Sequence, residues 1–262
     1  MNTEILLPDG TPVKLGCLQP EVMRFESAGS WADANDVLPE DQWEEHDDYA
    51  GFTPPIKSQK NNNCTNASWS ELFSTLWESV GEPPVELSWS YLYALNNGGR
   101  DQGAMCRDIA ADSLSRGNPL ATLCPESQIF VPRGGWPKAV IDDARSRLAL
   151  EIYQCMNWAD VGSALTRRFL VYHGFVLGNA FFGTRSDGKV PSYDGRRSNG
   201  HAMWSRGLTR RFGDMRAIVP NTWGVSYGDQ GIGYIDKSYF WAQSGGYFNL
   251  DAYAVRAVKK PG

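Results

Sequence analysis

The feature that most constrains this chain is a loop that ends on a cysteine and leads into an amphipathic segment. The loop covers residues 55–63 and is followed by Cys64. Apolar residues then recur at the spacing of one face of an α-helix: Trp69, Leu72, Phe73, Leu76 and Val80. Gly81 can end such a helix because glycine readily adopts the left-handed conformation of a helix stop. The sequence therefore predicts a buried helix that begins at Cys64.

The position of Cys64 at a helix N-terminus has a chemical consequence. The free N–H groups and the dipole of the first turn favour a thiolate, so we expect the pKa of this thiol to be lowered. Asn62 or Asn63 can cap the first turn through a side-chain oxygen. A lone cysteine is more often a small buried apolar side chain, so a nucleophile needs partners elsewhere in the chain.

Two later stretches contain such partners. His201 begins an apolar segment that is predicted to be a strand. Asn221 and Trp223 follow at the end of another predicted strand, ahead of a glycine-punctuated turn that leads to Ile235. With Cys64, these stretches place a thiol, an imidazole and a carboxamide in the order Cys, His, Asn.

These motifs resemble those of the papain-like cysteine peptidases. That family has a Gln-containing loop, a Cys that opens a helix, a Gly-His or Asp-His before a strand, and an Asn-Ser-Trp-Gly motif with a Trp-Gly-x-x-Gly-Tyr tail. The matching stretches here are residues 59–64, Gly200 with His201, and residues 221–235. Residues 38–43 are also similar to the opening of the family's mature domains. The resemblance implies a hydrolase, namely a thiol protease that cleaves peptide bonds.

The resemblance also implies a role for each site residue. Cys64 and His201 would share a proton as thiolate and imidazolium, which makes the sulfur nucleophilic without a metal. Asn221 would orient the imidazole under the cover of Trp223. Gln59 and the backbone N–H of Cys64 would donate to the developing oxyanion. A peptide or protein is the substrate, and no cofactor is expected.

The order of the predicted elements indicates an α+β chain, with helices first and a mostly antiparallel sheet second. By resemblance, residues 38–262 form a two-lobe domain, with a helical lobe at about 55–130, a β lobe at about 145–262 and the site in the cleft between them. Residues 1–37 are predicted to be an N-terminal extension, too short for the family's usual helical inhibitory prodomain, so zymogen control of that type is not expected. Met105 is the candidate wall of a substrate pocket.

Composition excludes several other classes of protein. The net charge of −5 and the pI near 5.3 argue against a nucleic-acid surface. No window is apolar enough for a membrane span, and the first residues do not form a secretory signal. Three histidines without paired spacing make a metal site unexpected, and the odd count of five cysteines favours reduced thiols. A cytoplasmic or virion-associated protein is therefore expected.

Alternatives remain at the helix start and at the level of function. Gln59 lies five residues before Cys64 where the family usually has six, and Lys60 replaces the usual glycine. A competing alignment places Ser68, which precedes a tryptophan, at the nucleophile position. The chain could then be a catalytically silent papain-like module, for instance in a phage particle with an assembly partner. A third reading is a peptidoglycan or isopeptide amidase that uses the same Cys64 and His201 pair.

Overall fold

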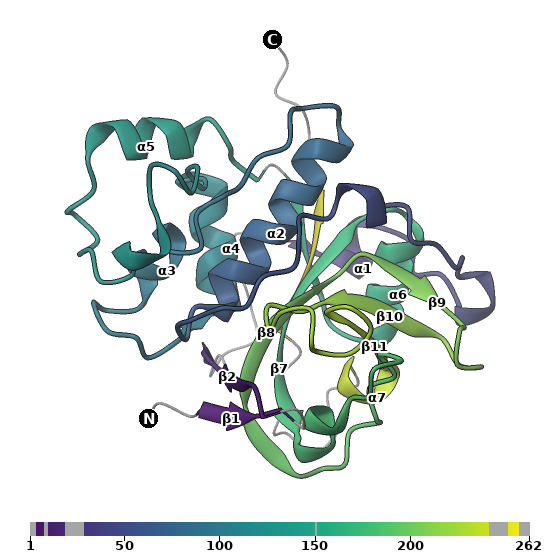
Figure 1. Ribbon diagram of the computed structural model, residues 1–262. Helices are drawn as coiled ribbons and strands as arrows, with labels where there is room; N and C mark the ends of the chain where they lie inside the picture. Colours follow the sequence, from purple (N-terminus) through teal and green to yellow (C-terminus); the bar gives the residue numbers. More distant parts are fainter. Residues whose placement is uncertain (1–3, 8–9, 19–28, 150, 241–250, 257–262) are drawn as a thin grey trace.

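The computed structural model describes residues 4–7, 10–18, 29–149, 151–240 and 251–256. A helical lobe and a β lobe pack side by side, with one long helix between them (Figure 1). Buried apolar side chains form two cores, one around this helix and the helical lobe, the other inside the β lobe. The two-lobe α+β architecture predicted from the sequence is thus confirmed.

Helices occur in both lobes of the described part of the chain, and they make up most of the helical lobe. The α-helices are α1 (Trp31–Ala34), α2 (Cys64–Ser79), α3 (Tyr91–Asn96), α4 (Cys106–Ser115), α5 (Lys138–Arg145), α6 (Trp158–Thr166) and α7 (Lys237–Phe240). Short 3₁₀ turns cover Glu40–Gln42, Ala50–Phe52, Glu126–Gln128 and Asn179–Gly183. None of the helices in the described part of the chain is long and apolar enough to cross a membrane.

The strands form one large sheet, one smaller sheet and two ribbons. They are β1 (Glu4–Leu6), β2 (Pro12–Lys14), β3 (Cys17–Leu18), β4 (Gly29–Ser30), β5 (Ala104–Met105), β6 (Glu151–Cys155), β7 (Leu170–Gly178), β8 (Arg197–Ser205), β9 (Gly207–Thr209), β10 (Arg216–Pro220), β11 (Ile232–Asp236) and β12 (Asp251–Arg256). The sheet orders are β4-β6-β12-β7-β8 and β11-β10-β9, and the ribbons are β1-β2 and β3-β5.

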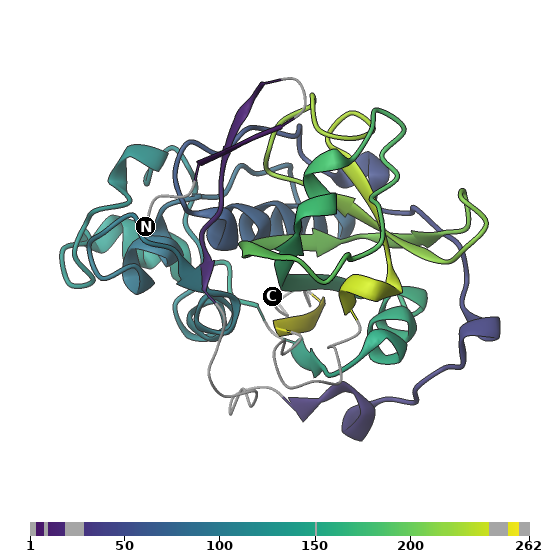
Figure 2. The same cartoon turned by 90° about the horizontal axis from the view of Figure 1, so that it is seen from below.

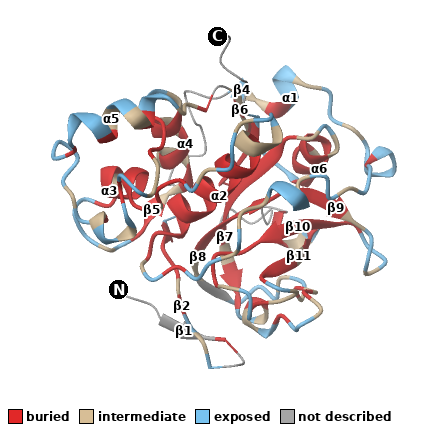
Figure 3. Ribbon diagram, turned by 45° about the horizontal axis from the view of Figure 1, so that its top comes forward, coloured by how far each residue is buried: buried red, intermediate tan, exposed pale blue. Residues whose placement is uncertain are grey.

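Helix α2 is buried because it lies between the two lobes, as its almost continuous burial in Figure 3 shows. Its apolar face packs on β7 and β8, where the ring of Trp69 meets that of Tyr172 edge-on at 5.2 Å. The side chain of Glu71 is buried in the same interface and accepts a hydrogen bond from Trp204 Nε1 at 3.2 Å. This packing fixes the first turn of α2 against strand β8.

One local expectation, a side-chain cap on α2, was wrong. Asn63 precedes α2, but its side chain donates to the carbonyl of Trp89 and does not cap the helix. Helix α3 begins at Tyr91, after a turn in which Ser88 Oγ accepts hydrogen bonds from the N–H groups of Ser90 and Tyr91. His173 lies in the middle of strand β7 and is buried.

The N-terminal residues contribute to both lobes. Strand β4 pairs in parallel with β6, and Trp31 directly after it is fully buried against Tyr153 and Phe169. Strands β2 and β3, drawn in purple in Figure 2, run between the helical lobe and the β lobe. The domain boundary at residue 38 stays a prediction, although residues 29–34 pack as part of the β lobe.

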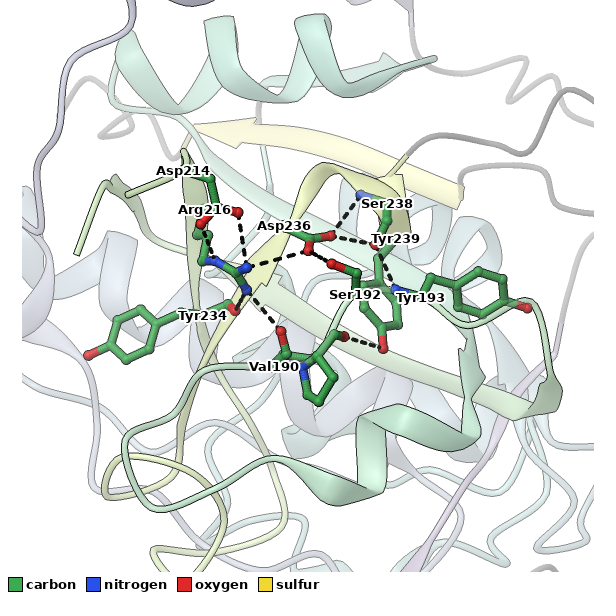
Figure 4. A network of polar contacts seen from close by, with 10 residues as sticks. Val190, Ser192, Tyr193, Asp214, Arg216, Tyr234, Asp236, Ser238 and Tyr239 are labelled. Atoms are coloured by element: carbon green, nitrogen blue, oxygen red, sulfur yellow. Dashed lines mark hydrogen bonds and ion pairs between the residues drawn. The ribbon is translucent and has the colours of Figure 1, made fainter. Parts of the chain in front are cut away.

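A buried ionic network ties the smaller sheet to the segment that leads toward β8 (Figure 4). The Arg216 side chain pairs with Asp214 at 2.9 Å and Asp236 at 3.5 Å, and it donates to the carbonyl oxygens of Val190 and Tyr234. Each remaining N–H thus has an oxygen partner, which compensates for taking a guanidinium out of water. The network therefore fixes β10, which leads directly to Asn221.

Candidate active site

The sulfur of Cys64 lies where the start of α2 meets strand β8. Cys64 is the first residue of the helix and has no exposed surface. Its Sγ accepts a hydrogen bond from the backbone N–H of Ala202 at 3.5 Å. Since Ala202 directly follows His201, the thiol is held beside the strand that carries the histidine.

The imidazole of His201 is oriented by the segment after β10. Its Nε2 is 2.8 Å from Asn221 Oδ1, and its ring stacks on Trp223 with 4.5 Å between centroids. Because the carboxamide oxygen can only accept, Nε2 carries the proton and Nδ1 keeps a free lone pair. Nδ1 is buried and has no hydrogen-bond partner among the described residues. The arrangement leaves one nitrogen of a fixed ring available for proton transfer.

The Gln59 side chain is held by a residue that sequence reasoning did not single out. Its Oε1 accepts a hydrogen bond from the hydroxyl of Thr222, and its backbone N–H donates to the carbonyl of Thr222 at 2.8 Å. The side-chain amide therefore points its Nε2 hydrogens the other way. They bond to the carbonyls of Asn61 at 2.9 Å and Lys14 at 3.2 Å. The only sequence signal for Thr222 was its place between Asn221 and Trp223.

Ser68, the competing candidate, lies one turn further along α2. Its hydroxyl donates to the carbonyl of Ala202 at 2.8 Å, whereas Cys64 Sγ meets the N–H of that same residue. Both side chains therefore face β8. The hydroxyl of Ser68 serves a structural hydrogen bond, and the thiol of Cys64 is the group nearer to the start of the helix.

An extended N-terminal segment, residues 14–18, lies directly over this thiol. The backbone N–H of Gly16 acts to lower the pKa of the Cys64 thiol, which places it near the sulfur. The carbonyl of Gly16 accepts a hydrogen bond from the N–H of Ala104 at 2.9 Å. Strand β3 then pairs in parallel with β5, which places Leu18 beside Met105. A short strand segment, and no helical domain in the described part of the chain, thus covers the Cys64 thiol and Met105, the candidate pocket wall.

Burial under this segment sets the protonation of the site. Loss of water raises the pKa of the Cys64 thiol to about 12, with the nearby Cys17 sulfur acting in the same direction. Burial also lowers the pKa of His201 to about 4, although the hydrogen bond that the ring donates to Asn221 acts in the opposite direction. The lowered thiol pKa expected from the helix N-terminus is therefore wrong for this covered state. Both groups are neutral at pH 7.

The remaining ligand chemistry is sparse. All five cysteines are buried free thiols. Within the described ranges, no group of three histidine, cysteine, aspartate or glutamate side chains is placed to hold a metal ion. The functional groups gathered at the candidate site are therefore a thiol, an imidazole and side-chain amides.

Comparison with known proteins shows where this arrangement occurs. No protein-family model and no curated protein sequence matches the chain. Solved structures do match. Xylellain, a cysteine protease from Xylella fastidiosa, superposes with a TM-score of 0.68 at 15% identity, over 94% of this chain and 96% of that one.

Two further structures agree. Digestive procathepsin L2 from the larval midgut of Tenebrio molitor gives a TM-score of 0.70 at 14% identity, over 93% of this chain and 78% of that one. Procathepsin B from Trypanosoma congolense gives 0.65 at 15% identity, over 92% and 86%. The chain therefore has the two-lobe fold of the papain-like cysteine proteases.

Proposed function

We propose that this chain is a papain-like cysteine peptidase with Cys64 as nucleophile. The proposal depends mainly on the hydrogen bond between His201 and Asn221, which lies beside the stacked ring of Trp223. The residue after His201, Ala202, donates its backbone N–H to Cys64 Sγ, so the thiol lies beside the same strand. A buried imidazole with one nitrogen fixed and the other free is what proton transfer from a neighbouring thiol requires.

The chemical steps follow from these positions. Nδ1 of His201 accepts the proton of Cys64, and the thiolate attacks the carbonyl carbon of a peptide bond. Gln59 and the backbone N–H of Cys64 donate to the oxyanion, a contribution typically on the order of 10²–10³ in rate. His201 then protonates the leaving amine, and water hydrolyses the thioester. Asn221 keeps the ring in place during both transfers.

Substrate can reach the thiol only when residues 14–18 leave. The carbonyl of Lys14 accepts a hydrogen bond from the side-chain amide of Gln59, and the backbone of Gly16 lies next to the Cys64 thiol. In this state the thiol is neutral and enclosed. Displacement would admit water, favour the ion pair and free the oxyanion donors.

The proposal is tested by alkylation and turnover of two matched variants. With the segment displaced, iodoacetamide at pH 5–6 should label Cys64, because an ion-paired thiolate reacts there and a neutral thiol does not. Cys64→Ala should abolish both labelling and hydrolysis of a denatured protein substrate. Ser68→Ala should keep both while losing about 1 kcal/mol of stability, since it removes only the bond to Ala202.

A silent module is the second candidate, and the raised pKa of the enclosed Cys64 thiol favours it. In that case neither labelling nor turnover appears under any condition that displaces the segment. Such a result would leave a papain-like scaffold with a binding or assembly role. Hydrolysis of peptidoglycan or isopeptide substrates, with no cleavage of ordinary peptides, would replace the peptidase by an amidase.

A further inference from the structure

Two thiols lie close together where the covering segment crosses into the helical lobe. Cys17 Sγ and Cys106 Sγ are 3.6 Å apart, and both side chains are buried. Cys17 belongs to β3 of the segment, directly after Gly16, which contacts Cys64. Cys106 is the first residue of α4 in the body of the helical lobe. The pair therefore joins a removable element to a fixed one.

The surroundings hold these two sulfurs face to face. Pairing of β3 with β5 sets Cys17 opposite Ala104, two residues before Cys106. Both sulfurs lie over Gly174 of β7, where an added Cβ would come within 2.6 Å of Cys17 Sγ and 3.0 Å of Cys106 Sγ. Only a residue without a side chain leaves room for both sulfurs at that point.

We propose that Cys17 and Cys106 form a redox latch, a reversible disulfide that locks the N-terminal segment over the active site. The proposal rests on the function proposed above, because it regulates access to Cys64. Reduced, the pair lets the segment leave. Oxidised, the segment is covalently tied to α4 and the nucleophile stays covered.

The chemistry balances with a low-molecular-weight disulfide such as oxidised glutathione as the oxidant. Cys17 is exposed when the segment lifts, and its thiolate attacks the small disulfide and releases one reduced thiol. When the segment returns, Cys106 gives up its proton and attacks the mixed disulfide, which releases the second reduced thiol. The two protein thiols are oxidised, and one small disulfide is reduced to two thiols.

The disulfide would act by keeping the covering segment, residues 14–18, attached beside the site, so that a substrate can no longer displace it easily. Without it, a substrate competes with a segment that dissociates freely at its N-terminal end. With it, residues 14–18 remain within reach of their contacts at a high effective concentration. The enclosed chain between the two cysteines spans 89 positions and includes Cys64, so the bond also restricts the opening of the helical lobe around the site.

The test uses the full chain, oxidised with glutathione disulfide or reduced with a phosphine. Peptide mapping without reduction should yield one linked pair that joins the Cys17 and Cys106 peptides, in the wild type and in Cys64→Ala alike. Iodoacetamide labelling of Cys64 should fall by roughly tenfold or more on oxidation and return on reduction. Cys17→Ser and Cys106→Ser should not respond, whereas Cys155→Ser, a buried thiol of β6, should respond like the wild type.

Three results would overturn the latch. They are a Cys17 to Cys64 link, no link at all, or a Cys17 to Cys106 link that leaves Cys64 labelling unchanged. None of these readouts requires turnover. If the chain is inactive but still forms the link and loses Cys64 labelling on oxidation, the peptidase proposal is wrong and the latch proposal stands. If the chain is active but does not form the link, the latch proposal is wrong and the peptidase proposal stands.

Discussion

At the scale of single residues, Asn221 acts through one hydrogen bond to His201. The contact of 2.8 Å fixes the tautomer and the tilt of a ring that also stacks on Trp223. An amide is suited to this place because it remains an acceptor, without changing charge, whether the ring is neutral or protonated. We therefore propose that this side chain positions the ring, so its loss should affect catalysis more than packing.

We expect Asn221→Ala to lower kcat/KM by on the order of ten- to a hundredfold, a share of the 10²–10⁴ that a positioned general base contributes. Asn118→Ala is a matched control, because it removes another buried asparagine, which bonds Ser70 and Ser88 far along the helical lobe. Both variants should lose similar stability in a thermal melt. Equal kcat/KM for the two would show that Asn221 does not orient the imidazole.

At the scale of elements, the contact of α2 with β8 contains a buried carboxyl group, that of Glu71. Burial raises the pKa of Glu71 to about 8, against the Trp204 hydrogen bond. The folded protein therefore keeps this carboxyl protonated at pH values where the unfolded chain, with a pKa of 4.5, has released the proton. Stability from this group is complete below about pH 4.5 and is lost as the pH rises toward 8.

Glu71→Gln should remove that pH dependence, because glutamine keeps an acceptor for Trp204 and does not titrate. The free energy of unfolding of the variant minus that of the wild type should rise from pH 5 to pH 8, by up to about 1.4 kcal/mol per pH unit. Urea denaturation across this range measures it. Taking the difference cancels the titration of His173 and His201, which both proteins share. A difference that does not change with pH would mean that Glu71 is ionised in the folded state.

The Arg216 network is the second element-scale device, because it couples β10 and β11 to the segment around Val190 (Figure 4). Arg216→Met should cost about 3–5 kcal/mol, since it leaves the buried Asp236 carboxylate without its cation. Adding Asp236→Leu should recover most of that loss. Arg211→Met, which breaks an exposed pair with Asp229, should change the urea midpoint little. A small effect of Arg216→Met alone would show that the hydroxyl groups of Ser192 and Ser238, which donate to Asp236, are enough to stabilise its carboxylate.

At the scale of the whole molecule, the covering segment lies between the two lobes and reaches across to each. Gly16 approaches the loop before α2 so closely that an added Cβ would lie 1.8 Å from the carbonyl oxygen of Asn62. On the opposite side, a Cβ added at Gly103 would lie 2.3 Å from the carbonyl oxygen of Gly16. The seated state therefore requires glycine at both points, and a side chain at Gly16 is incompatible with it.

Gly16→Ala should weaken seating and raise the rate at which iodoacetamide labels Cys64 under native conditions. Gly29→Ala is the control, because a Cβ there meets nothing within 4 Å. Labelling is followed by intact mass at pH 6. A rate for Gly16→Ala equal to that of Gly29→Ala would mean that the segment does not control access to the thiol.

Much of the fold could be predicted because it depends on local patterns. The apolar residues of α2 recur at helical period and end at Gly81, so the helix and its first residue are visible in the sequence. His201 and Asn221 precede or follow strongly apolar strands, and their order matches a known family. These signals involve neighbours in the chain, and a single sequence contains them.

The covering of the site depends on contacts between residues that are far apart. Strand β3 is two residues long and pairs with a strand almost 90 positions away, so it has no periodic signal. Its presence over Cys64 excludes water and reverses the pKa shift that the helix N-terminus alone predicts. The sequence by itself determined which helix or strand carries the thiol, the imidazole and the amides, because these elements follow from local apolar periodicity. Only the tertiary structure decided that they are neutral and closed, because desolvation depends on which distant segment packs over them.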